Sequence, residues 1–225
     1  MSTYVMSDIH GCIKAYHQML KKIAFMPDDH LYIIGDVIDR GNEGVNVLLD
    51  IMARNNVTML LGNHEMMMME ALVAMSDPAN SESCPELDAW AINGCMPTLN
   101  QLDTLSDDQF SRMMDYLSHL KARLDIEVGG RKFHLVHGAP GGKNATDREL
   151  VWTRVEKDDP PFYSDRTVIS GHTPTIYYND GNKTDIWHGN GVIVIDCGCF
   201  IERIPGRLGC LRLDDMQEFY TSEWE

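Results

Sequence analysis

The sequence predicts an α/β fold in four layers, in which two mixed β-sheets pack together and helices cover their outer faces. Two observations predict this fold. In the N-terminal third, three short apolar runs alternate with helical patterns, which is the order of repeated βαβ units. The second half of the chain is mainly strand-like, so it supplies the second sheet that packs against the first.

The N-terminal strands are expected at residues 3–7, 31–34 and 57–61. Between the first two, apolar residues recur at three- and four-residue spacings from Ile13 to Ile23, the pattern of an amphipathic helix. A second helix is expected between the second and third strands, with Val45 and Met52 on its apolar face. The strands start about 28 residues apart, as parallel strands with helical crossovers do.

The middle of the chain is expected to be helical. Residues 66–75, which include four consecutive methionines, predict a buried helix, because methionine packs well in cores. Further helices are expected at 87–92 and across 104–124. Residues 76–106 are interpreted as a cap region within one domain that spans residues 1–225.

The second half favours strands. Residues 126–128 and 132–136 flank Gly129-Gly130 and predict a hairpin. A loop is expected to carry Trp152 and Arg154, and further strands are expected at 167–170, 191–196 and 209–213.

Composition limits the partners. With 19 basic and 34 acidic residues the formal net charge is −15, which disfavours nucleic acid and anionic membranes as main partners. No run of about 18 apolar residues predicts a membrane span, and the N-terminus lacks the pattern of a signal peptide. The six cysteines form no C-x-x-C pair and are expected to be reduced thiols in a cytoplasmic protein. The oligomeric state is left open.

Polar residues follow five of the predicted strands, and parallel strands place such clusters at one edge of a sheet. Oxygen and imidazole donors without thiolate suit manganese, iron or zinc. The donors exceed what one tetrahedral ion needs, so two cations are expected, with Asp36 as the best bridging carboxylate. The clustered residues are Asp8, His10, Asp36, Asp39, Arg40, Asn63, His64, His137 and His172.

Each of these residues also has a structural interpretation. An Asp-x-His after a strand usually caps a turn, and His137 alone could be a core histidine. Five polar clusters at successive strand ends outweigh these interpretations. The other histidines, at 17, 30, 119, 134 and 188, are expected to be surface or packing residues, and Glu65 is expected to cap the helix that it begins.

Five sequence blocks together resemble one family. The blocks Asp8-Ile9-His10, Gly35-Asp36-Val37-Ile38-Asp39-Arg40-Gly41, Gly62-Asn63-His64-Glu65, His137-Gly138 and Gly171-His172 match, in order, the signature of the calcineurin-like metallophosphoesterases. The Asp-Arg-Gly form of the second block resembles the phosphoprotein phosphatase branch. Within that branch the chain is similar to the small serine/threonine phosphatases of bacteria and bacteriophage lambda.

The resemblance implies a role for each residue. Asp8 and His10 would bind the first metal, Asp36 would bridge, and Asn63, His137 and His172 would complete the second. A hydroxide between the cations, most simply two Mn²⁺ with Fe or Zn as alternatives, would attack phosphorus directly. His64 would be the general acid, with Asp39 holding its imidazole. The phosphate would be bound by Arg40, Asn63, His64 and Arg154.

The resemblance therefore implies a phosphoprotein phosphatase acting on phosphoserine and phosphothreonine, with phosphotyrosine as a further candidate. A phosphorylated protein or a small phosphoester would be its substrate. The alternative is a dinucleoside polyphosphate hydrolase, such as one for diadenosine tetraphosphate, because that family shares the blocks and the Gly171-His172-Thr173-Pro174 form. A nuclease is disfavoured by the net charge. A catalytically inactive binding module would be indicated by a lost ligand, and no ligand is missing.

Overall fold

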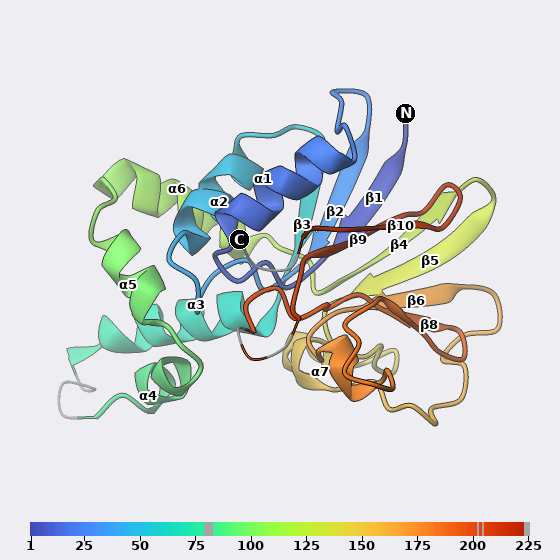
Figure 1. The fold of residues 1–225 in the computed structure, drawn as a ribbon. Coiled ribbons are helices and arrows are strands. Elements are labelled where there is room, and N and C mark those ends of the chain that lie inside the picture. Colours follow the sequence, from blue (N-terminus) through green and yellow to red (C-terminus); the bar gives the residue numbers. More distant parts are fainter. Residues whose placement is uncertain (79–82, 202, 204, 223–225) are drawn as a thin grey trace.

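Two five-stranded mixed sheets form the centre of the molecule in the computed structural model (Figure 1). The first sheet has the order β10-β9-β1-β2-β3. Its strands β1 (Thr3–Met6), β2 (His30–Ile34) and β3 (Val57–Leu60) are parallel, while β9 (Gly209–Arg212) and β10 (Gln217–Tyr220) are antiparallel to their neighbours. The structure describes residues 1–78, 83–201, 203 and 205–222.

The second sheet has the order β4-β5-β6-β8-β7. Strands β4 (Arg123–Val128) and β5 (Arg131–Val136) form the predicted hairpin around Gly129 and Gly130. Strand β5 pairs in parallel with β6 (Thr167–Ser170), which pairs in parallel with β8 (Val192–Val194). The two-residue strand β7 (Trp187–His188) closes the edge.

The alternation of side chains along the strands builds the layers. In β1, Met6 packs on the side of α1 (Ile13–Lys22) and α2 (Gly44–Met52), whereas Val5 points to the second sheet. In β6, Ile169 contacts the first sheet and Val168 faces α7 (Asp147–Trp152) on the outside. This arrangement of two packed mixed sheets with helices outside confirms the predicted fold.

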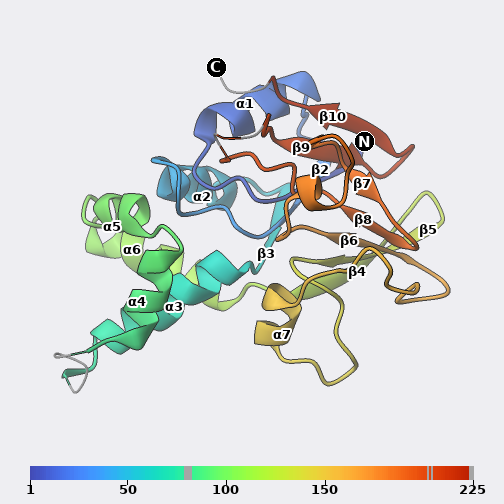
Figure 2. The same cartoon turned by 60° about the horizontal axis from the view of Figure 1, so that its bottom comes forward.

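Four helices within residues 63–78 and 83–118, called the helical arm below, stand beside the first sheet (Figure 2). It comprises α3 (Asn63–Met75), α4 (Pro85–Ile92), α5 (Met96–Leu102) and α6 (Asp107–Ser118). The interpretation of residues 76–106 as a cap includes residues 79–82, which lie outside the described residues. None of the helices described here is both long and apolar enough to cross a membrane.

Several predicted boundaries are wrong. The helix expected over 104–124 ends at Ser118, because Lys121 already forms a parallel bridge with Leu60 of β3. Trp152, expected in a loop with Arg154, is the last residue of helix α7, whose N-terminus is capped by reciprocal hydrogen bonds between Thr146 and Glu149, and Arg154 lies after that helix. Strands β7 and β10 and helix α5 were not predicted, since short or polar segments such as 217–220 give no clear periodicity. The six cysteines form no disulfide.

Candidate metal centre and active site

The loops after β1 and β2 are held together by their backbones at the edge of the first sheet. The amide of His10 donates to the carbonyl of Asp36 over 3.0 Å, and that of Asp8 donates to Gly35 over 3.2 Å. Among the described residues, nine non-glycine residues have a positive φ, and six of them are predicted site residues. Such backbone is costly and tends to collect at functional sites. The six are Asp8, His10, Asp36, Asp39, Arg40 and His172.

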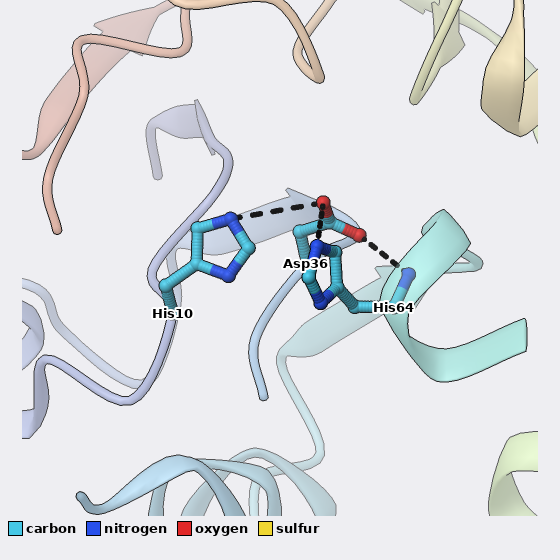
Figure 3. Close-up of side chains that lie close together, drawn as sticks. All are labelled: His10, Asp36 and His64. Carbon is cyan, nitrogen blue, oxygen red and sulfur yellow. Dashed lines mark hydrogen bonds and ion pairs between the residues drawn. The ribbon is translucent and has the colours of Figure 1, made fainter. Parts of the chain in front are cut away.

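Asp36 lies at the centre of the cluster. Its Oδ2 is 3.8 Å from the Nε2 of His10, 3.8 Å from the Nε2 of His64 and 3.2 Å from the Nε2 of His137. Its Oδ1 accepts a 3.0 Å hydrogen bond from the backbone amide of His64 at the start of α3 (Figure 3). Two groups of side chains are close enough to hold a metal ion, and both include Asp36: His10, Asp36 and His64, and Asp36, His137 and His172.

The second group joins the two sheets. His137 follows β5 directly, and His172 lies two residues after β6. The amide oxygen of Asn63 is 2.9 Å from both the Nε2 of His137 and the Nδ1 of His172. The backbone amide of His172 donates to Asp8 Oδ2 over 3.1 Å. Asp8 thus lies between the groups, and its Oδ1 is 4.0 Å from the Nε2 of His10.

Backbone carbonyls orient two of the imidazoles. The Nδ1 of His10 lies 3.0 Å from the carbonyl oxygen of Ile38, and the Nδ1 of His137 lies 2.8 Å from that of Ile34. Each Nε2 therefore faces the cluster. A hydrogen bond from the outer ring nitrogen to a carbonyl is the usual support for a metal-binding histidine. The donor set and its orientation fit divalent cations.

Buried charge also fits cations at this position. Burial, opposed by His137 and reinforced by Asp36, raises the pKa of Asp8 to about 7. Burial disfavours the charged form of His137, but the Asp36 carboxylate outweighs this and raises its pKa to about 10. Burial, together with Asp8, raises the pKa of Asp196 well above its usual range. A cation bound here would favour the ionised forms of Asp8 and Asp196, because its charge would offset the repulsion between these carboxylates and Asp36.

The predicted general acid is held by its predicted partner. His64 is fully buried, and its Nδ1 is 2.7 Å from Asp39 Oδ2. The helical arm fixes Asp39 in turn: the indole of Trp90 donates to Oδ2 over 2.6 Å and the hydroxyl of Thr98 donates to Oδ1 over 2.6 Å. The Nε2 of His64 lies 3.1 Å from the guanidinium of Arg40.

Glu65 does more than cap its helix. Its buried carboxylate accepts the backbone amide of Gly62 at the start of α3, as the sequence predicts for a capping residue. It also accepts the amides of Asp36 and Val37 at 2.9 and 2.8 Å and that of Ile38 at 3.3 Å. Glu65 therefore fixes the loop that carries Asp36, a role the sequence did not reveal because the loop lies 27–29 residues away.

A pocket of about 560 Å³ opens onto the cluster. Arg40, His64 and His172 line it, and Arg154, which the resemblance implies as a second phosphate-binding arginine, also lies in its wall. The sequence does not single out other lining residues, because they lie outside the five blocks and have no chemical signature of their own: Tyr177, Phe200 and Arg203.

The family that the fold and the cluster define is that of the metallophosphoesterases. A model of the calcineurin-like phosphoesterase family matches residues 1–198, so the chain belongs to this family and the predicted resemblance is confirmed. Family membership implies a site for divalent cations. The two groups that share Asp36 are where this chain offers the ligands.

Similar proteins include a symmetrical bis(5'-nucleosyl)-tetraphosphatase from Salmonella paratyphi A, which is 35% identical over 131 residues, or 57% of this chain and 46% of that protein. Over the first curated relatives the chain spans between 25% and 46% of their length.

Solved structures share the fold. The crystal structure of a candidate diadenosine tetraphosphatase has a TM-score of 0.68 at 17% identity and covers 99% of this chain and 94% of its own. A protein serine/threonine phosphatase from Saccharomyces cerevisiae has a TM-score of 0.58 at 15% identity, covering 100% and 80%. At these identities the structures compare the fold alone.

The expectation of a phosphoprotein phosphatase is wrong. The curated relatives are named as tetraphosphatases, which favours the alternative stated with it. The physical reason is that the five blocks supply metal ligands and phosphate contacts, which both reactions need. The blocks therefore do not distinguish the two substrate classes.

Proposed function

We propose that the chain hydrolyses a dinucleoside polyphosphate, with diadenosine tetraphosphate as the representative substrate. The observation that carries the proposal is the charge of the pocket wall, where three arginines, Arg40, Arg154 and Arg203, surround the cluster at Asp36. One phosphomonoester needs fewer cationic groups than this. A polyphosphate chain carries a negative charge on each phosphate, and guanidinium groups pair with phosphate oxygens as planar forks.

The names of the relatives support the same substrate class. Symmetrical bis(5'-nucleosyl)-tetraphosphatases are named for this substrate, and residues 1–198 match the family model. In the proposed reaction, water attacks a phosphorus atom within the tetraphosphate and the phosphoanhydride bond breaks. When the cleavage of diadenosine tetraphosphate is symmetrical, two molecules of ADP leave.

The cation ligands are proposed to be those of the two groups at Asp36, with Asp8 and Asn63 beside them. We propose two Mn²⁺ ions, because oxygen and imidazole donors without thiolate suit this metal. When bound, divalent cations neutralise phosphate oxygens and lower the pKa of water. The proposed ligands are Asp8, His10, Asp36, Asn63, His137 and His172.

The remaining residues act on the substrate itself. Arg40 reaches into the cluster, where one guanidinium nitrogen is 2.8 Å from the Nε2 of His10 and the other 3.1 Å from that of His64. When substrate binds, a phosphate oxygen would replace the two histidine nitrogens as the partner of Arg40, and this contact would fix the polyphosphate in the pocket. His64, oriented by Asp39, would give a proton to the leaving oxygen, although a phosphate leaving group, being weakly basic, needs this proton less than an alkoxide does. Asn63 and Arg154 would complete the phosphate contacts.

The test compares substrates at equal enzyme and manganese. Diadenosine tetraphosphate is expected to be hydrolysed faster than a phosphothreonine peptide, and chromatography should show ADP as the product. The variant Arg203→Gln should lose more kcat/KM on the tetraphosphate than on p-nitrophenyl phosphate. The matched control is Arg112→Gln, because Arg112 is an exposed arginine on α6, outside the pocket, that forms an ion pair with Asp108. Faster hydrolysis of the peptide would overturn the proposal.

A further inference from the structure

Tyr177 is an aromatic ring that the fold leaves exposed at the mouth of the pocket. It is 69% exposed, and of the large exposed hydrophobic side chains in the described residues it is the one that lines this pocket. Leaving a ring in water forgoes the free energy of burying it. Tyrosine also offers a flat apolar face with a polar tip, the combination used where one side of a residue meets a ligand.

Backbone hydrogen bonds fix the turn that carries Tyr177. It belongs to the 3₁₀ turn η2 (Thr175–Tyr177), which starts three residues after His172. The amide of Thr175 donates to the carbonyl of Asp196 over 2.7 Å, and the amide of Tyr177 donates to that of Pro174 over 3.0 Å. A ring held on such a turn loses little conformational entropy when a ligand covers it.

The next residue anchors the turn to the second sheet. The ring of Tyr178 is buried and stacks on Trp187 with centroids 4.7 Å apart, and its hydroxyl donates to the carbonyl of Val155 over 2.7 Å. Neighbouring tyrosines therefore have opposite environments. Tyr178 secures the turn, whereas Tyr177 has no packing role that explains its presence at the pocket.

The surroundings of Tyr177 match a nucleotide. Phe200 and Ile201 add apolar surface to the pocket wall, and Arg154 and Arg203 add positive charge. Aromatic rings stack on nucleobases and guanidinium groups bind the attached phosphates. A phosphopeptide or inorganic polyphosphate would use the arginines but would have no use for the aromatic face.

We infer that Tyr177, with Phe200, forms a nucleobase subsite that stacks the purine ring of a nucleotide whose phosphates bind at the arginines of the pocket. The inference rests on the proposed function, because it assigns the nucleoside end of the same substrate. It makes Tyr177 a specificity residue that acts through binding and takes no part in bond cleavage.

The test measures binding, so that it does not depend on turnover. Calorimetry with manganese present compares AMP with ribose 5-phosphate, which differ only in the base. The protein is expected to bind AMP roughly 10- to 100-fold more tightly. Tyr177→Ala should bind both ligands alike, and Tyr177→Phe should keep the preference for AMP. Tyr177→Leu, which keeps apolar area but has no ring face, should lose most of it.

The outcomes separate this inference from the proposed function. Equal binding of AMP and ribose 5-phosphate by the unchanged protein would overturn the subsite, even if diadenosine tetraphosphate is hydrolysed. A preference for AMP that persists in Tyr177→Ala would overturn the assignment to Tyr177. A preference that depends on Tyr177, in a protein that does not hydrolyse the tetraphosphate, would support the subsite and overturn the proposed reaction. Circular dichroism verifies that the variants fold.

Discussion

The two sheets build their halves of the site in different ways. The second sheet places His137 and His172 within two residues of strand ends, and a single backbone contact orients His137. The first sheet presents Asp8 and Asp36 equally close to the ends of β1 and β2, but the loop after β2 is also held by Glu65, and Asp39 in that loop is held by Trp90 and Thr98 of the helical arm. The candidate metal ligands thus lie close to strand ends in both sheets, whereas Asp39, the partner of the predicted general acid His64, also needs support from residues 51 and 59 positions further along the chain.

The largest effect is expected at Asp36, where the two halves meet. Asp36→Asn should remove bound metal and lower phosphoesterase activity by about 1,000-fold, roughly 4 kcal/mol, because both candidate metal groups share this carboxylate. Metal content by atomic emission and hydrolysis of p-nitrophenyl phosphate measure the two losses. The control Asp108→Asn changes an exposed ion pair with Arg112 and should alter neither. Full metal content in the Asp36 variant would contradict its place in both groups.

The next largest effect tests how Glu65 supports the loop after β2 in the first sheet. Glu65→Gln should destabilise the metal-free protein by about 3 kcal/mol, because two of the four backbone amides at this carboxylate would face an NH₂ group instead of an acceptor. Urea unfolding measures the change. Glu127→Gln, at an exposed position of β4, is the control and should shift the free energy by less than about 0.5 kcal/mol. Equal midpoints for the two variants would show that Glu65 contributes only a helix cap.

A smaller effect tests whether the helical arm supports Asp39 without affecting the candidate metal ligands. Thr98→Val removes the hydroxyl that donates to Asp39 Oδ1 and accepts from the Asp39 amide over 2.9 Å. Activity should fall about 10- to 100-fold, as for other residues that orient a functional group, while metal content stays unchanged. Thr98→Ser keeps the hydroxyl and should retain most of the activity. A parallel loss of metal would mean that the arm supports the whole site and that the two halves do not differ in this way.

The smallest effect concerns the proton that a cation must displace from His137, which follows β5 in the second sheet. The pKa of His137 is raised to about 10 in the metal-free protein, so below that pH its imidazole carries a proton that a cation must displace. Affinity for Mn²⁺ should therefore rise about tenfold per pH unit between pH 7 and 8.5, and more steeply below pH 7, where Asp8 also binds a proton. Calorimetry in buffers of different ionisation enthalpy measures the released protons. Constant affinity across this range would contradict the assignment.

The sequence predicted the residues that directly follow strands better than the residues that support them. The five blocks are local, so Asp8, Asp36, Asn63, His137 and His172 could be placed at one edge from strand order alone. Trp90 and Thr98 contact Asp39 from 51 and 59 residues along the chain, and no local pattern marks a residue whose role depends on such distant packing. The same limit applies to the pocket residues that we propose bind the substrate, since Tyr177 and Arg203 are unremarkable as sequence.

The order of strands in the first sheet has a consequence for how the site forms during folding. Strand β1, which leads into Asp8 and His10, pairs on one side with β2 and on the other with β9, which lies some 200 residues further along the chain. Contacts of such long sequence separation are slow to form. The strand that leads into the Asp8 and His10 loop therefore has one unpaired edge until residues 209–212 have been synthesised and have docked against it.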